Sequence, residues 1–584
     1  MLPTLPPPNT LVRQFLIAVD VALGELSVAR GTCRRFEALH ASRMQAVAVA
    51  LAASLTAALQ AELEAAGFVA FEAITAADLR GEPGSSLAQV DALLAEAVAL
   101  QDLVSGVPPL AAALGLGPDA PRGELAVRWL AHPLKIRFHR HFLAPGSATN
   151  RPDKPEWMYA HVAKWLRKHA LVAVFRVGAV LAPDAPDGVA ALQATFASVV
   201  LEWVAFKVNA ELEASWASPG FLLAHAISET LAFDESLDAL LHTPAAADIH
   251  ILPCFYAHER RVEAWLALER DAAHAELDAL LAGSDVAQAR GVIGLTSALL
   301  DRLYGVPGCR AFQRGMVELV AHIASRYLRV LVAELRGMIG SSSLAPAQWS
   351  RAATVLNSMK TVRDALAAED DALRALSLAA ALADGAAADS LFGSIVDAYA
   401  LAADSQIDSL AENVEHTFHV YTSGYRHAAA DEASLRLAPG LSALRGVLGL
   451  VEPVLASPLF ETFCATVGVR LARYLLKHVV RKPKKRYTAA TGATLAADMR
   501  SVVLLVRREF PESRRVGVVF APLLQTVDLL ALPPADLAEL RQQAEAVRLL
   551  GLPAKARAFL EVNAADAIGS IDDLFRLLEL RGDV

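Results

Sequence analysis

The sequence predicts an all-α protein, and three observations support this fold class. Alanine, leucine and valine dominate a composition that is 54% hydrophobic but only 6% aromatic, and alanine and leucine favour helices. Apolar residues recur at helical spacing along most of the chain, and no alternating β-branched runs bounded by hairpin turns occur. With 584 residues the chain exceeds one ordinary core, so several domains or a stack of subdomains is expected.

The first element is a long helix, or two stacked helices, from Leu11 to about Gly67. A helix of this length suits pairing with a second long helix of another protein. An intramolecular hairpin with a helix at about 76–104 explains the pattern equally well. The sequence leaves these two arrangements open.

Proline and glycine clusters mark the helix boundaries that follow, because both residues end helices for steric and entropic reasons. The clusters are Gly106–Gly123, Ala182–Gly188, Gly340–Ala347, Asp431–Gly440, Arg481–Gly492 and Ala531–Asp536. They predict an N-terminal helical region (1–122), central bundles (123–340), a middle bundle (341–435) and a C-terminal bundle (436–584). A short strand at Val516, in the segment VGVVFAPLL, is the one alternative to helix, and no repeat of fixed period is visible.

Bulk properties limit the function classes. The best membrane-span candidate, Met44–Leu59, is shorter than the roughly 20 residues a span needs, so we expect a buried helix face and no transmembrane segment. The N-terminus has no signal-peptide pattern, and the four dispersed cysteines suggest free thiols in a reducing compartment. A net charge of −9 does not suggest a nucleic-acid binder.

The segment from Trp129 to His169 concentrates aromatic and basic residues. Asp153 is placed to cap a helix that has Pro155 in its first turn and Glu156 three residues after the cap, as in a capping box. The next helix has an apolar face formed by Met158, Val162, Trp165, His169 and Val172. Phe138 and Phe142 lie one helical turn apart. We therefore expect a buried structural seam rather than an active site.

No catalytic, cofactor-binding or metal-binding constellation is predicted. GLGPDA (Gly115–Ala120) formally matches a dinucleotide fingerprint but follows no strand and contains Pro118. His139 and His141 are two residues apart, so on a helix they point in different directions. The acidic run Glu369–Asp371 is expected to be a solvated turn.

The basic run RKPKKR, which comprises Arg481, Lys482, Lys484, Lys485 and Arg486, has three interpretations. A solvated loop is the plainest. Contact with an anionic membrane surface or an acidic partner is the second, because clustered cations gain from a negative surface potential. A nuclear-localisation signal is the weakest.

The Trp129–His169 segment resembles the central signature of the Rint/Tip family of vesicle-tethering subunits. The matching residues are Pro133, Leu134, Arg137, Phe138, His141, Phe142, Lys154, Pro155, Glu156 and Trp157. Weaker blocks follow in the family's order: ISETLAFDESL (227–237), ILPCFYAHERRVEAWLALER (251–270), LLDRLYGVP (299–307) and TVLNSMKTVRDAL (354–366), where a Leu-Asn pair is expected to open a helix. With the last helices, the resemblance covers about four-fifths of the chain.

The resemblance implies an elongated curved rod of stacked helical bundles, the CATCHR-type fold of tethering subunits. It implies a non-catalytic subunit of the Dsl (NRZ) complex, cytoplasmic and peripheral on the endoplasmic reticulum (ER), acting in Golgi-to-ER retrograde transport of COPI vesicles. Family members pair with a second helical tether subunit through their N-terminal helices and bind ER SNAREs through the C-terminal region, while contact with the COPI coat is indirect. No cofactor is implied.

Three alternatives remain open. The first is a subunit of another helical-rod tethering complex, of the exocyst or COG type. The second is a nuclear checkpoint adaptor that uses the basic run. A remote third is a helical enzyme of the terpene-synthase kind, which would need Asp370 and Asp371 to converge on a deep pocket.

Overall fold

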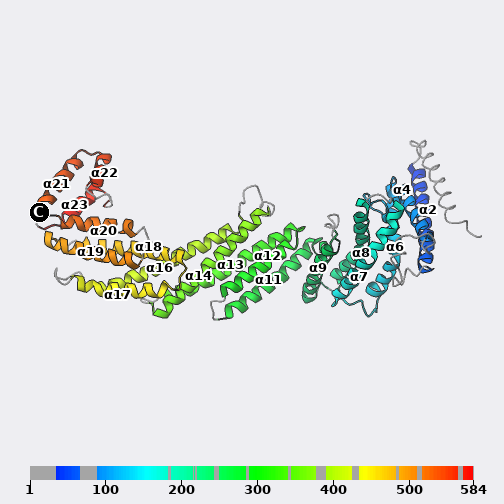
Figure 1. The fold of residues 1–584 in the computed structure, drawn as a ribbon, viewed down its shortest axis with the longest axis horizontal. Coiled ribbons are helices and arrows are strands. Elements are labelled where there is room, and N and C mark those ends of the chain that lie inside the picture. The colour runs from blue at the N-terminus through cyan, green and yellow to red at the C-terminus, as the bar shows by residue number, and fades with distance from the viewer. Residues whose placement is uncertain are drawn as a thin grey trace, which may run out of the picture. The chain divides into compact units, whose positions relative to one another are not determined.

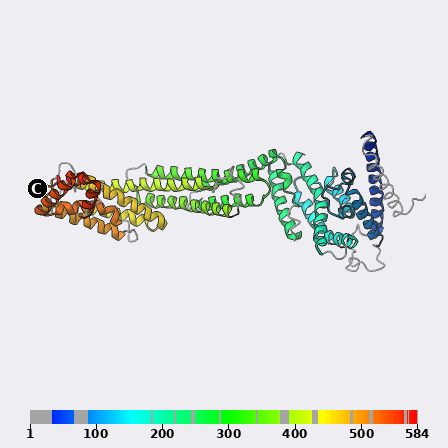
Figure 2. The ribbon, with the colours of Figure 1, turned by 90° about the horizontal axis from the view of Figure 1, so that it is seen from above.

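The computed structural model confirms the all-α class. It describes residues 34–65, 88–181, 186–214, 216, 220–241, 249–283, 288–339, 344–376, 390–423, 433–481, 486–509, 516–562, 568 and 570–582. Within these ranges the chain forms helices and turns without a strand, and an isolated bridge joins Tyr487 to Arg581 (Figures 1 and 2). The contacts divide the chain into a first unit (Met1–Glu269 with Gly305–Phe312) and a second unit (Arg270–Tyr304 with Gln313–Val584). The predicted four-region division stays a prediction.

The first unit is built around helices that each bury one face against two or three neighbours. Its elements are α2 (Arg34–Ala65), α4 (Ala88–Val104), α5 (Pro108–Ala113), α6 (Glu124–Phe138), the π-helical η1 (His139–Leu143), α7 (Pro155–Leu181), α8 (Pro186–Ala214), α9 (Gly220–Leu241), α10 (Pro253–Tyr256) and the start of α11 (Glu259–Ala282). Helix α8 packs against α6 and α7, and α7 also packs against α9 and α4. This arrangement places the segment Trp129–His169 at the centre of the unit.

The second unit continues the same architecture. Its elements are the remainder of α11, α12 (Gln288–Tyr304), α13 (Arg310–Ile339), α14 (Pro346–Ala375), α16 (Gly393–Thr422), α17 (Ala433–Val451), α18 (Ser457–Tyr474), the π-helical η5 (Leu475–Val480), α19 (Ala489–Glu509), α20 (Val516–Ala531), α21 (Pro534–Leu549), α22 (Pro553–Val562) and α23 (Ile571–Leu578). Helix α16 packs against α14, α17 and α18, while α20 packs against α19 and α18. Among the last three helices, α21 packs against α22 and α23, and α23 packs against α20.

One prediction of local structure is wrong, and a second is confirmed only in part. The segment at Val516 is the helix α20, because its buried residues Phe520, Leu523 and Val527 recur at helical spacing and face α18 and α19. Tertiary packing here overrides the strand preference of the valines. The cluster Asp431–Gly440 contains a helix start, because α17 begins at Ala433, but the helix is not broken at Pro439, which lies inside it. By contrast, helices end or begin as predicted at Gly340–Ala347 and Ala531–Asp536.

The N-terminal helix packs within its own unit. On α2, the buried residues Ala48, Ala52, Leu55, Leu59 and Leu63 form one stripe that contacts α4, α5 and α6. The intramolecular alternative is therefore confirmed for this stripe, while the predicted helix between Leu11 and Cys33 lies outside the described residues.

Three described helices are long and apolar enough to cross a membrane by length and composition, namely Gln45–Ala65, Ala191–Ala214 and Ala489–Arg508, and the bent pair Val518–Ala531 and Pro534–Leu549 would make a fourth. The prediction that the α2 stretch is too short is wrong, because the helix continues beyond Leu59 to Ala65. Only part of that stretch is buried, whereas Ala191–Ala214 is buried for the most part between α6 and α7.

Four helix starts receive a hydrogen-bonding side chain from another helix, 17 to 99 residues away in the sequence, and we call these side chains remote caps. Gln101 Oε1 accepts from the backbone N–H groups of Gly123 (3.1 Å) and Leu125 (3.0 Å) at the start of α6. The remaining remote caps are Asp234 for the turn before α10 (Ile251 N, 3.0 Å; Leu252 N, 2.9 Å), Asn357 for α18 (Ala456 N, 2.8 Å) and Asp370 for α16 (Leu391 N, 2.7 Å; Phe392 N, 3.0 Å). They satisfy backbone donors that a helix start leaves unpaired.

The remote caps correct two expectations. Asp370 does not lie in a solvated turn, because it is buried and also accepts from Arg374 Nη2 at 2.9 Å. Burial alone would raise the pKa of Asp370, but hydrogen bonds from Ser390 and the capped backbone, with the Arg374 charge, hold that pKa below its usual value. Asn357 lies inside α14 rather than at its start, and its Nδ2 also donates to the Val454 carbonyl at 2.5 Å.

We predict that Asp370→Ala lowers the free energy of unfolding of the second unit by about 2–3 kcal/mol, because two buried N–H groups and a guanidinium lose their acceptor. The matched control is Asp371→Ala, since Asp371 is exposed and its pairing with Arg374 is worth at most about 1 kcal/mol. Hydrogen exchange of the first turn of α16 under native conditions measures both. Equal protection in the two variants would contradict the capping role.

Candidate interaction surfaces

The aromatic residues of the signature form a packed seam between helices. Leu134, Phe138 and Phe142 are buried, with the Phe138 ring centroid 5.4 Å from that of Phe142 and 6.2 Å from that of Trp203 on α8. Pro133 is buried inside α6, and the π-helical turn η1 follows that helix directly. The contribution of this part of the signature is to hold α6 against α8.

The polar signature residues lie nearer the surface. His141 and Lys154 are exposed, while Arg137 and Glu156 are half-buried. The expectation of a uniformly buried seam is wrong for Trp157, which is 41% exposed on the first turn of α7. Trp157 is thus an exposed aromatic side chain next to the buried seam.

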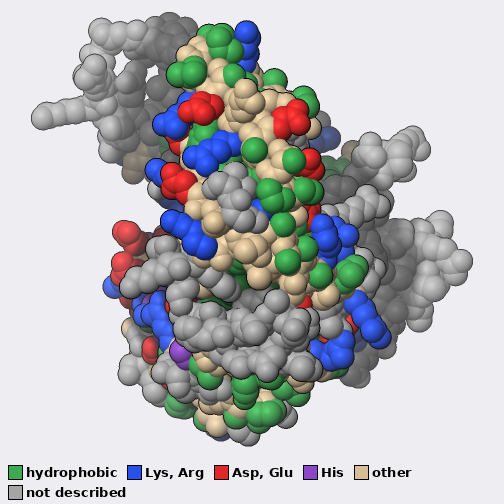
Figure 3. All heavy atoms as spheres, turned by 90° about the vertical axis from the view of Figure 1, so that its left-hand side faces the viewer, with side chains coloured by type: hydrophobic (Ala, Val, Ile, Leu, Met, Phe, Trp, Pro, Cys, Tyr) green, Lys and Arg blue, Asp and Glu red, His purple; other side chains and the backbone are tan. Residues whose placement is uncertain are grey.

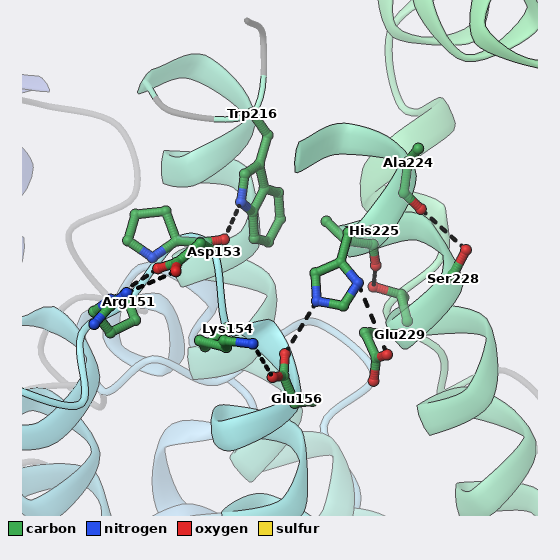
Figure 4. A network of polar contacts seen from close by, with 12 residues as sticks. Arg151, Asp153, Lys154, Glu156, Trp216, Ala224, His225, Ser228 and Glu229 are labelled. Atoms are coloured by element: carbon green, nitrogen blue, oxygen red, sulfur yellow. Dashed lines mark hydrogen bonds and ion pairs between the residues drawn. The ribbon is translucent and has the colours of Figure 1, made fainter. Parts of the chain in front are cut away.

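The start of α7 differs from the predicted capping box (Figure 4). Both carboxylate oxygens of Asp153 accept from the Arg151 guanidinium, at 2.8 and 2.7 Å. Glu156 instead faces Lys154 Nζ at 3.5 Å and His225 Nε2 of α9 at 3.2 Å. The carboxylate therefore links α7 to α9 rather than closing a capping box.

A second polar contact holds the loop before α7, here against the residue Trp216 that follows α8. The Trp216 indole N–H donates to the Pro152 carbonyl at 2.8 Å, so the loop before α7 is held against the end of α8 (Figure 4). The buried Tyr159 hydroxyl lies 2.6 Å from Thr230 Oγ1, which itself donates to the Ala226 carbonyl. These bonds fix the register between α7 and α9.

The histidines and carboxylates singled out in the sequence do not assemble into a reactive site. Among the described residues, no group of three or more His, Cys, Asp or Glu side chains is arranged to hold a metal ion. Asp370 serves as a remote cap, and Asp371 binds Arg374 Nη1 at 3.0 Å. The pair needed by the terpene-synthase alternative is therefore occupied by structural contacts.

The residue that follows the basic run, Tyr487, is hydrogen-bonded to the C-terminal segment after α23. Arg481 is half-buried and Arg486 is exposed, while Lys482, Lys484 and Lys485 lie outside the described residues. Tyr487 donates its N–H to the Leu580 carbonyl at 2.8 Å, and its carbonyl accepts from Gly582 N at 2.9 Å. The predicted loop is shorter than expected, because α19 already begins at Ala489.

An acidic groove with an apolar floor lies between α20 and α21 and was not foreseen from the sequence. The groove has a volume of about 410 Å³, with Leu529, Leu532 and Leu540 on its apolar side. Its acidic residues are Asp528, Asp536 and Glu539. The acidic residues that follow Pro533 and Pro534 were visible in the sequence, but their convergence depends on the 117° bend between the two helices.

The exposed side of α2 is a second candidate surface. Outside its buried stripe, the helix presents alanines together with the exposed Val47 and Val49. A helix face this poor in charge suits contact with another apolar surface.

We predict that Phe138→Ala lowers the free energy of unfolding of the first unit by about 3–5 kcal/mol, because it leaves a cavity in the seam. Trp157→Ala should cost less than about 1.5 kcal/mol, because a large part of the indole already faces solvent. Urea titrations of the Phe138→Ala and Trp157→Ala variants, with hydrogen exchange of α6–α8 as the readout, compare the two losses of stability. Similar losses would contradict the assignment of Phe138, rather than Trp157, to the core.

We also predict a pH-dependent stability that depends on His169, buried on α7. Burial, with the Lys168 and Arg137 charges, lowers the pKa of His169 to about 4. The unfolded chain therefore binds the proton first, and stability is lost as pH falls below the unfolded value of about 6.5. Between pH 7.5 and 5 the loss should be about 2 kcal/mol.

The urea midpoint of the first unit at the two pH values measures this loss. In the His169→Gln variant, the loss of stability between pH 7.5 and 5 should be smaller by about 2 kcal/mol. In the control variant His161→Gln, whose substitution lies on the exposed side of the same helix, the loss should stay the same as in the unaltered protein. An unchanged dependence in His169→Gln would show that other groups cause it.

Comparisons with known proteins agree with this fold. A crystal structure of the SNARE Sec20 bound to the Dsl1 complex subunit Tip20 contains a chain that matches with a TM-score of 0.62 at 12% identity, covering 97% of this chain and 98% of that one. A crystal structure of M-Sec matches with a TM-score of 0.50 at 14% identity, covering 99% and 97%. At such identities the likeness shows the fold, which is the helical fold of tethering subunits. No curated protein matches in sequence.

The sequence comparison addresses the family directly. Residues 125–291 match the sequence model of the RINT-1/TIP-1 family. The matched segment contains the whole signature, the remote cap Asp234 and the turn that it caps. The resemblance inferred from the signature is therefore confirmed: over residues 125–291 the chain is similar to the RINT-1/TIP-1 family.

Proposed function

We propose that the protein is a non-catalytic subunit of an ER tethering complex of the Dsl (NRZ) type. It would act in Golgi-to-ER retrograde transport of COPI vesicles, cytoplasmic and peripheral on the ER membrane. The observation that carries the proposal is the family match over residues 125–291, within a chain whose fold is similar to a chain of the Tip20–Sec20 structure over almost its full length. Contact with the COPI coat would be indirect, through other subunits.

The exposed side of α2 is the proposed contact for a second helical tether subunit. The buried stripe of α2 is already occupied by α4, α5 and α6, so a partner helix has the opposite side available. That side offers small alanines, which allow close approach of a second helix, and the exposed Val47 and Val49. Pairing there would leave the first unit's own core undisturbed.

The acidic groove between α20 and α21 is the proposed contact for an ER SNARE. Its apolar floor suits the apolar face of an amphipathic helix, and Asp536 and Glu539 suit basic residues that flank such a face. Asp528, the third acidic residue, pairs with Arg500 Nη2 at 2.5 Å, and both side chains are exposed. The groove therefore combines the two features that a basic amphipathic segment needs.

The basic run from Arg481 to Arg486 is proposed to support the same end of the protein by contacting an anionic membrane or an acidic partner. Its neighbouring residue Tyr487 is hydrogen-bonded to Leu580 and Gly582, which follow α23. Two separate binding surfaces on one chain raise the effective concentration of their partners for each other. Tethering by this means requires geometry rather than catalysis.

Affinity purification with mass spectrometry tests the proposal with two variants, each of which is expected to lose one partner and keep the other. Asp536→Lys/Glu539→Lys should lower SNARE recovery at least about 10-fold, because it places like charges against a basic segment, and should keep the second tether subunit. Val47→Asp/Val49→Asp should lose the second subunit and keep the SNARE, because charge is placed in an apolar contact.

The matched control is Glu259→Lys/Glu263→Lys, which reverses two exposed charges in the first turns of α11 and should keep both partners. Recovery of neither partner with the unaltered protein would overturn the function. Recovery of exocyst-type or COG-type subunits instead would overturn the assignment to the ER complex.

A further inference from the structure

The turn between α21 and α22 exposes three large apolar side chains that the proposed function does not use. We call Leu549, Leu550 and Leu552 the leucine tip, and their exposed fractions are 84%, 54% and 48%. In Figure 1 this turn points away from α19 and α20. Clustered exposed leucines at one turn indicate contact with an apolar environment outside the protein.

The turn that carries the leucine tip has a defined conformation. Gly551 has a φ of 61°, a left-handed conformation that other residues rarely adopt, and its N–H donates to the Arg548 carbonyl at 3.1 Å. Pro553 then begins α22, which suits the first position of a helix. Arg548 lies 3.3 Å from Asp572 and 5.2 Å from the Phe575 ring centroid, so the end of α21 is fixed to α23.

The charged residues nearest to the turn on its α22 side are cations. From Leu549 to Leu560 these are Lys555 and Arg557, while the exposed acidic residues Glu545 and Glu561 lie just outside this stretch. Both cations are exposed, and within the described residues neither has an ion-pair partner. Figure 3 looks onto this end of the second unit, where hydrophobic side chains lie among side chains of both charges, Lys and Arg as well as Asp and Glu.

We propose that the leucine tip contacts an anionic bilayer, with its leucines in the interfacial region and Lys555 and Arg557 at the lipid headgroups. A protruding turn lacks the concave floor that a partner helix needs, whereas a bilayer interface accepts protruding apolar side chains flanked by cations. Clustered cations add attraction because cytoplasmic leaflets carry negative surface potential. The proposal does not depend on SNARE binding, since the acidic groove comprises other residues of α20 and α21.

Vesicle flotation with the purified full chain and no other protein tests this contact. The unaltered protein should float with phosphatidylcholine vesicles containing about 30 mol% phosphatidylserine, more weakly as salt rises, and poorly with phosphatidylcholine alone. Leu549→Ser/Leu550→Ser/Leu552→Ser should lower the partition about 10-fold or more. Lys555→Glu/Arg557→Glu should lower it about 10-fold and reduce its salt dependence.

The matched control is Leu401→Ser/Val420→Ser/Tyr421→Ser, three exposed apolar residues of α16 in the same unit, which should leave flotation unchanged. The substituted side chains are exposed, so folding is expected to persist, and circular dichroism verifies it. Absence of flotation by the unaltered protein, or unchanged flotation of the leucine variant, would overturn the proposal. Leucine-dependent self-association without lipid binding would overturn it in favour of a second copy of this chain.

Discussion

Every helix start leaves backbone N–H groups without intrahelical partners, and a protein made almost entirely of helices meets this constraint repeatedly. Here Gln101, Asp234, Asn357 and Asp370 each project from one helix to the start of another element, across 17 to 99 residues of sequence. Each bond satisfies buried donors and at the same time fixes which helices are neighbours. The apolar helix faces, rich in alanine and leucine, bury most of the surface. Because one such face resembles another, apolar packing alone does not determine which helices become neighbours. The remote caps add this specificity.

The family signature is explained by the same principle. Its aromatic residues hold α6 against α8, and Glu156 bridges α7 to His225 of α9. Asp234, in the family block 227–237, accepts hydrogen bonds from the backbone N–H groups of Ile251 and Leu252, which begin the next block, 251–270. The segment shared with the RINT-1/TIP-1 family is therefore a folding core. The proposed contacts with partners lie outside it, on α2, in the acidic groove and at the leucine tip.

The three proposed surfaces differ in shape and charge, and each difference matches the proposed partner. Between Gln45 and Ala61 the exposed side of α2 carries uncharged and mostly small side chains, which suits a second helix, while Arg43 and Glu64 are exposed at its two ends. The groove between α20 and α21 is concave and acidic, which suits a basic amphipathic segment, while the leucine tip protrudes and is flanked by cations. The last two surfaces lie on consecutive helices, so SNARE binding and membrane contact would involve the same end of the second unit.

The sequence by itself determined the helical class, several boundaries and the family segment, because composition, helical spacing and proline positions act locally. Several local expectations failed. Packing against α18 and α19 keeps α20 helical despite its valines, α17 continues through Pro439, and Asp153 binds its near neighbour Arg151 instead of capping α7. Only the tertiary structure decided that Asp370 is a buried cap and Trp157 an exposed ring. It also assembled the acidic groove, since that site depends on the angle between two helices. Burial and helix orientation depend on which residues distant in sequence come together, and local periodicity carries no record of those partners.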